Sequence, residues 1–138
     1  MQRVEIMPGF PGLDRIPRDG SPGIYPVEAR AVAEALRGLG WEAVYATAEH
    51  RHVDAGDGAC WLPVLRFGED TRARTAAEVT ARLVDAVGAG REVIHLEYHR
   101  RAGGGTEKLR ASGSAADLTG LLRTVAAEDV GQGTAGPG

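Results

Sequence analysis

Two histidines and a glutamate alternate along one short segment of this chain, as His95, Glu97 and His99. Apolar residues lie between them, and this alternation over Val93–His99 predicts a β-strand. Alternate residues of a strand project from the same face, so the three polar side chains are expected to form one row. Imidazole and carboxylate groups are suitable ligands for a divalent metal such as Zn²⁺. The segment is therefore a candidate metal site.

A further ligand is available after another predicted strand, Trp41–Thr47. Glu49, His50 and His52 follow this strand, and we take His52 as the fourth candidate ligand. The alternative is that the row at 95–99 is only the solvated side of a half-buried antiparallel strand, which needs polar residues there in any case.

A glycine turn near the C-terminal end is flanked by basic side chains. The four candidates for anion binding are Arg100, Arg101, Lys108 and Arg110, on the two sides of Gly103–Gly105. Cations and backbone amides at such a turn can hold a phosphate or a nucleotide. A P-loop would lead into a helix, whereas Thr106–Ala111 is predicted to be a strand. Arginines on a protruding hairpin are also explained by solubility alone.

The segment Pro8–Pro26 contains four glycines and five prolines and is predicted to be a long loop. Loops of this length are often functional or disordered. Its spaced apolar residues can pack on a partner protein or on the chain's own sheet, and a ligand lid is a third interpretation. The residues proposed for partner binding are Phe10, Leu13, Ile16 and Tyr25.

The remaining pattern predicts the elements that would position these residues. Five strands are expected, at Arg3–Met7, Trp41–Thr47, Cys60–Phe67, Val93–His99 and Thr106–Ala111. Three helices are expected: Val27–Leu39, a second one that begins with a Thr75–Glu78 capping box and stops at Gly88 and Gly90, and a third that is capped by Ser114. This order predicts an α+β fold, a ferredoxin-like βαββαβ sandwich with an added C-terminal hairpin strand and helix.

Composition limits the class of protein. The 138 residues carry 16 basic and 19 acidic side chains, and this slight acidity disfavours a dedicated nucleic-acid binder. All the basic residues except Lys108 are arginines, a bias typical of GC-rich bacterial genomes. Residues 1–128 are expected to form one domain, and residues 129–138 a disordered tail.

Location and catalysis are constrained by a few absences in the sequence. The chain has one cysteine, Cys60, no secretory signal and no apolar run long enough for a membrane span, so we expect a cytoplasmic protein. Cys60 lies in an apolar strand, and no Gly-x-Ser-x-Gly motif is present. Nucleophilic catalysis is therefore disfavoured.

The C-terminal half is similar to one known family. A strand at Glu92–Tyr98, a glycine hairpin, a return strand at Glu107–Ser112 and a helix from Ala116 resemble the end of effector-associated constant-component domains of actinobacterial conflict systems. The likeness covers about Thr75–Ala127, and the Pro8–Pro26 loop does not match that family. It implies a non-catalytic adaptor and assigns no functional residue.

The leading hypothesis is a small non-catalytic cytoplasmic protein, an adaptor or accessory subunit that binds another protein or a second copy of itself. One alternative is a metal-dependent enzyme or sensor built on His95, Glu97 and His99. Another is anion or nucleotide binding by the Arg100–Arg110 hairpin.

Overall fold

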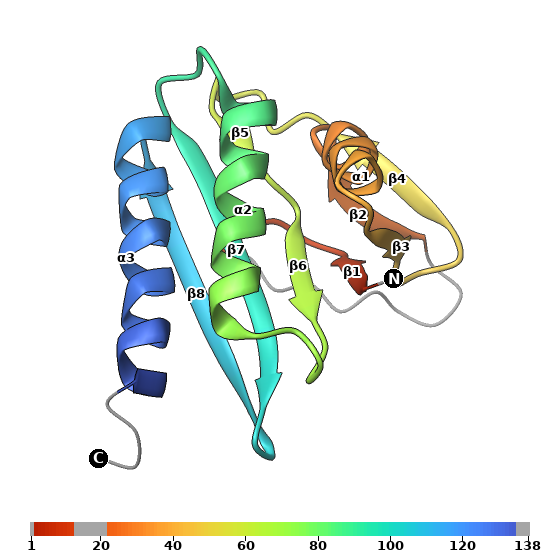
Figure 1. The fold of residues 1–138 in the computed structure, drawn as a ribbon. Coiled ribbons are helices and arrows are strands. Elements are labelled where there is room, and N and C mark those ends of the chain that lie inside the picture. The colour runs from red at the N-terminus through yellow and green to blue at the C-terminus, as the bar shows by residue number, and fades with distance from the viewer. Residues whose placement is uncertain (1, 13–21, 135–138) are drawn as a thin grey trace.

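In the computed structural model of this chain, the backbone is described for residues 2–12 and 22–134, and the side chains of these residues up to 128. The described residues form eight strands and three helices (Figure 1). In chain order these are β1 (Arg3–Met7), β2 (Gly23–Pro26), α1 (Ala29–Gly38), β3 (Glu42–Tyr45), β4 (His50–Val53), β5 (Cys60–Trp61), β6 (Val64–Phe67), α2 (Ala73–Gly88), β7 (Ile94–Ala102), β8 (Gly105–Gly113) and α3 (Ala115–Thr134).

The main sheet is mixed, and its long strands lie in the order β3-β1-β6-β7-β8. Strand β1 pairs in parallel with β3, to which α1 connects it, and β6 pairs in parallel with β7 through α2. The two units meet at an antiparallel β1–β6 pair, and β8 returns antiparallel to β7. The short β5 also pairs with β7, while β2 and β4 form a separate parallel pair.

The α+β class is confirmed, but the strand order differs from the ferredoxin-like arrangement that we predicted. In the split βαβ unit of that arrangement, another strand separates the two strands that a helix connects. Here the helix-connected strands are direct neighbours. The amphipathic pattern of each element is the same in both arrangements, so it cannot reveal which strands are neighbours.

All three helices pack on one side of the main sheet (Figure 1). The core lies between them and the sheet, with fully buried side chains such as Ile6, Leu36, Phe67 and Leu96. Successive residues of a strand point to opposite faces, so the polar residues between these positions lie on the other face of the sheet. That second face, which we call the open face, carries the predicted row at 95–99.

Several predicted boundaries are corrected by the structure. The strand predicted for Cys60–Phe67 is divided into β5 and β6, since Pro63 has no N–H to donate to a ladder. Strands β2 and β4 were not predicted, and part of the supposed Pro8–Pro26 loop is therefore β2. Residues 13–21 lie outside the described residues.

The helix caps were predicted with mixed success. Ser114 caps α3 as expected, because its Oγ accepts a hydrogen bond from the Asp117 N–H at 3.1 Å. The Thr75–Glu78 capping box is wrong: α2 already begins at Ala73, and Glu78 instead pairs with Arg74 at 2.9 Å. Helix α3 continues to Thr134, through residues that we expected in a disordered tail, and residues 135–138 are not described.

No helix in the described ranges is long and apolar enough to cross a membrane.

Two helical glycines give opposite expectations for replacement by alanine. A Cβ at Gly88, where α2 ends, would overlap Ile94 Cδ1 and lie 3.0 Å from Ile94 Cγ1. Gly120 in α3 has no described atom within 4 Å of the same position. We expect Gly88→Ala to lower the free energy of unfolding by about 1–2 kcal/mol through overpacking. Gly120→Ala should raise it by about 1 kcal/mol through helix propensity. Urea denaturation of both variants checks this, and equal shifts of the same sign would contradict it.

Candidate functional site

The three side chains of the predicted row on β7 do not all contact one another. Glu97 and His99 are in contact, with 2.6 Å between Glu97 Oε2 and His99 Nε2. His95 instead bonds through Nδ1 to Ser112 Oγ on β8, at 2.6 Å. No three His, Cys, Asp or Glu side chains in the described ranges are grouped so that they could hold a metal ion. The three side chains lie in one row, but Glu97 and His99 contact each other while His95 bonds to Ser112.

Glu97 is a buried carboxylate on the open face, and it binds Gly12 at the start of the N-terminal loop. Only 2% of the residue is exposed, and its Oε1 accepts the Gly12 N–H at 2.8 Å. Its Oε2 contacts His99 and lies 3.9 Å from Lys108 Nζ. Burial by itself would raise the pKa of Glu97, but the hydrogen bonds from Gly12 and His99 and the charges of His99 and Lys108 hold it below the ordinary value.

Beside this carboxylate, aromatic rings cover another part of the open face. Trp61 stacks on His95 with ring centroids 3.9 Å apart, and Phe10 meets Trp61 edge-on at 5.6 Å. The Trp61 indole also donates to the Asp57 carboxylate at 2.9 Å. The first residues of the loop therefore pack on the chain's own sheet, as one of the interpretations of this segment predicts.

The fourth predicted metal ligand, His52, belongs to a separate cluster around β4. Its Nε2 lies 2.9 Å from the Tyr45 hydroxyl, and Tyr45 stacks on His50 with centroids 4.0 Å apart. Burial lowers the pKa of His52, and the nearby Arg30 and His50 lower it further. The contacts of His52 are thus with β2, β3 and β4, whereas those of His95 are with β5 and β8.

The four predicted anion-binding residues do not share one surface. The β7–β8 register places Lys108 opposite His99 and Arg110 opposite Glu97, so both lie on the open face with Arg101. Arg100 is on the other face, where its guanidinium bonds to Glu107 at 2.7 Å and to the Thr71 carbonyl at 3.2 Å. Arg100 joins the hairpin to the chain just before α2, so the predicted four-cation site is divided.

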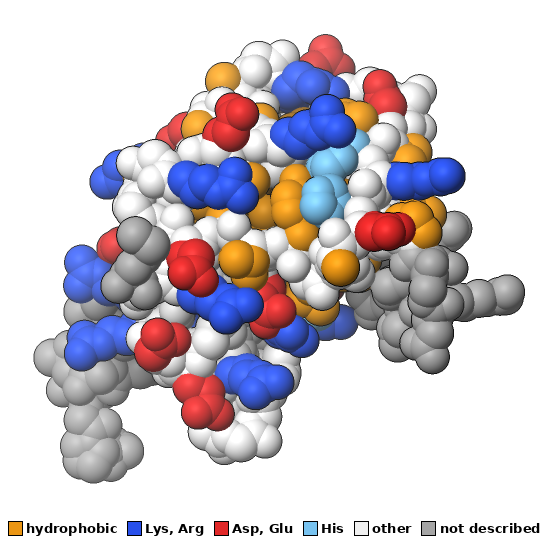
Figure 2. Space-filling view, turned by 90° about the vertical axis from the view of Figure 1, so that its right-hand side faces the viewer, with side chains coloured by type: hydrophobic (Ala, Val, Ile, Leu, Met, Phe, Trp, Pro, Cys, Tyr) orange, Lys and Arg blue, Asp and Glu red, His pale blue; other side chains and the backbone are white. Residues whose placement is uncertain are grey.

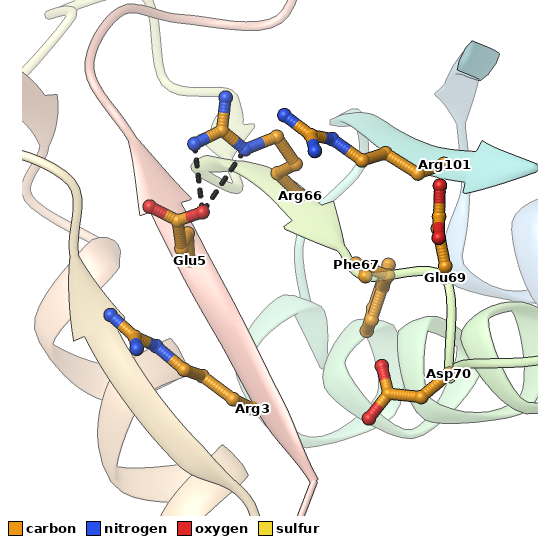
Figure 3. A pocket seen from close by; sticks show the side chains of 8 residues that line it. Arg3, Glu5, Arg66, Phe67, Glu69, Asp70 and Arg101 are labelled. Carbon is orange, nitrogen blue, oxygen red and sulfur yellow. Dashed lines mark hydrogen bonds and ion pairs between the residues drawn. The ribbon is translucent and has the colours of Figure 1, made fainter. Parts of the chain in front are cut away.

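A pocket of about 580 Å³ opens between the ends of β1, β6 and β7. Figure 3 shows the Arg66–Glu5 pair on one side of it and Glu69 and Asp70 on the other. Both Nε and Nη2 of Arg66 donate to Glu5 Oε1, at 3.1 and 2.7 Å. The complete charged lining is Arg3, Arg66 and Arg101 with Glu5, Glu69 and Asp70. Because these charges balance, the pocket does not select for an anion.

The predicted partner-binding residues have different environments. Phe10 lines an apolar groove of about 370 Å³ between the β2–β4 pair and Trp61. Tyr25 is fully buried and bonds to Thr47 Oγ1 at 2.9 Å, so it is a core residue and its prediction as a contact residue is wrong. Leu13 and Ile16 lie outside the described residues.

The same groove contains Val53, which sequence reasoning did not select, and Ile24, an apolar residue of the Pro8–Pro26 segment that was not among the four proposed contacts. Ile24 of β2 is 38% exposed and Val53 of β4 is 41% exposed, and both line the groove. Val27 is also 41% exposed and donates its N–H to the Val53 carbonyl at 3.1 Å. The only signal available was the short sequence His50–Val53, which is too polar and too short to predict a strand by periodicity.

The cysteine is not a candidate nucleophile in this fold. Cys60 is fully buried, and burial raises the pKa of its thiol to about 11. A thiol with this pKa is protonated at neutral pH, and only the thiolate is strongly nucleophilic.

Comparisons of the chain with protein-family models, with curated proteins and with solved structures found no match.

Proposed function

We propose that this protein is a non-catalytic adaptor or accessory subunit, which binds another protein or a second copy of itself through the surface around β4. The observation that supports this is the apolar groove lined by Phe10, Ile24, Val53 and Trp61. Exposed apolar residues that gather on one surface, instead of being scattered, are typical of sites that bind other proteins. A reducing compartment such as the cytoplasm suits the chain, because its single cysteine cannot form an internal disulfide.

The metal-binding and anion-binding hypotheses depend on residues that already form bonds within this fold. Glu97, the central member of the proposed metal row, bonds to Gly12 and His99 within the fold. Arg100, the first of the four proposed anion ligands, is paired with Glu107. The groove around β4 has apolar side chains that the fold leaves partly exposed, and we therefore assign the function to it.

Site-specific photo-crosslinking tests the proposal. A photoreactive amino acid replaces Val53 in the groove, and in a separate variant it replaces Leu121 on α3, which is exposed to the same degree (41% and 42%). We expect the protein with the probe at position 53 to form a discrete adduct in its native host, either with another protein or with itself. The variant at position 121 should not form this adduct. Absence of an adduct at 53, or the same adducts at both positions, would contradict the proposal.

A further inference from the structure

One edge of β4 is free of any other strand in the described part of the chain. On its other side, the Glu49 and Val53 carbonyls accept hydrogen bonds from β2 and from Val27, which follows it. The N–H and C=O of successive strand residues point alternately to the two sides of a strand. His50 and His52 therefore direct their backbone groups away from β2, where they can pair with an added strand.

Two arginines lie near this edge, while Glu49 and Asp54 flank β4 at its two ends. Arg30 of α1 and Arg51 of β4 are exposed, and neither forms an ion pair with a described residue. The groups whose charges act on His52 are Arg30 and His50. Figure 2 faces this side of the molecule and shows histidines next to hydrophobic side chains, with several Lys or Arg side chains and some Asp or Glu side chains around them. Such a surface favours a partner with negative charge.

The register of the β2–β4 pair predicts the pattern of that partner. Ile24 lies opposite Arg51 and Pro26 opposite Val53, so these residues share the face that borders the apolar groove. His50 and His52 project from the other face, toward Tyr45 and Arg30. A strand added at the free edge would therefore place one set of alternate side chains beside Arg51 and Val53, and the other set beside His50, His52 and Arg30.

We propose that β4 binds an extended, acidic segment of a different protein, with alternating apolar and acidic residues, by adding it as a third strand to the β2–β4 pair. This inference rests on the proposed function and specifies the partner of the same surface. Backbone hydrogen bonds to His50 and His52 provide the pairing, and Arg30 selects the acidic side chains.

A second copy of this chain fits the edge less well. Two-fold antiparallel pairing of β4 with itself, centred on Arg51, places Arg51 opposite Arg51 of the other copy. Like charges directly across a strand pair are destabilising, so the free edge favours an acidic partner over self-association.

Peptide binding tests this inference directly. The probe is a fluorescein-labelled peptide of eight residues that alternate valine and glutamate, and its counterpart carries lysine in place of glutamate. We expect fluorescence anisotropy to show saturable binding of the acidic peptide and at least about tenfold weaker binding of the lysine peptide. On binding, the amides of His50 and His52 should become protected from hydrogen exchange. Equal binding of both peptides, or no binding, would overturn the inference.

Two modifications separate strand addition from general charge attraction. Methylating the backbone nitrogens of the peptide residues whose amides face β4 should abolish binding, while methylating the alternate set should not, because only one set pairs with the edge. Arg30→Glu should weaken acidic-peptide binding about tenfold and improve lysine-peptide binding. Arg123→Glu, on the exposed side of α3, is the matched control and should change neither. Equal sensitivity to both methylation patterns, or an equal effect of the two charge reversals, would overturn the inference.

Failure of the strand-addition inference can be distinguished from failure of the proposed function. If the probe at position 53 captures a discrete protein but the acidic peptide does not bind, the adaptor proposal stands and strand addition is wrong. If size-exclusion chromatography with light scattering shows a dimer that Arg51→Glu disrupts, the occupant is a second copy, and the inference of an acidic foreign segment is wrong.

Discussion

Phe67→Ala is expected to lower the free energy of unfolding by about 3–5 kcal/mol, the range for removing a large aromatic side chain from a core. Phe67 is fully buried in β6, one of the inner strands of the main sheet. Its ring meets Trp41 edge-on at 5.6 Å and Tyr98 edge-on at 5.7 Å. Its loss therefore leaves a cavity between the two βαβ units, and the surrounding β-strands cannot easily close it.

Chemical denaturation followed by circular dichroism measures this effect. Phe10→Ala is the matched control, because Phe10 is only partly buried and contacts Trp61 on the open face. We expect the control to lose much less stability than the Phe67 variant. Similar losses for the two variants would mean that the open face contributes as much to stability as the helix-covered core, contrary to the packing described above.

Glu97→Ala is expected to have the second largest effect, a loss of about 2–4 kcal/mol. The substitution leaves the Gly12 N–H and His99 without the acceptor that each contacts. Both hydrogen bonds are part-buried, and a donor that loses its partner in such a site is only partly compensated by water. Glu5→Ala is the control, because the Glu5–Arg66 pair is about one-third exposed and its removal should cost about 1 kcal/mol or less.

The Glu97 effect should also depend on pH in a defined direction. The pKa of Glu97 in the folded protein is lower than its ordinary value of 4.5, so folding favours the ionised carboxylate. Its contribution to stability is therefore fully present above that ordinary value, and it is lost as the pH falls through the folded pKa. The stability difference between the wild-type protein and Glu97→Ala should shrink in acid. A difference that stays constant over this range would contradict the role assigned to the carboxylate.

Local sequence patterns predicted the elements well where each is amphipathic or capped by its own residues. Strand β1 was predicted with the observed boundaries, and the Ser114 cap of α3 is present. The second helix ends at Gly88, the first of the two glycines, Gly88 and Gly90, at which its end was predicted. The pairing of the strands was not predictable in this way, because Val4, Ile6 and Leu65 would show the same alternation beside any neighbour.

The candidate site was predicted only in part. Alternation correctly put His95, Glu97 and His99 on the face away from the helices, but it could not show that Gly12, distant in the sequence, bonds to Glu97. The β4 surface was missed for a similar reason. Strand β4 has four residues, two of them histidines and one an arginine, and it pairs with β2, which comes from a distant part of the sequence.

The sequence by itself determined the α+β class, the amphipathic helices and the set of polar residues that one face of the sheet would carry. These follow from periodicity and capping, which act between residues close together in the chain. The tertiary structure decided which strands are neighbours, that the carboxylate of Glu97 holds Gly12, and that β4 has a free edge beside exposed Ile24 and Val53. Those features depend on contacts between distant segments, and local hydrophobic patterns do not encode which distant segments meet.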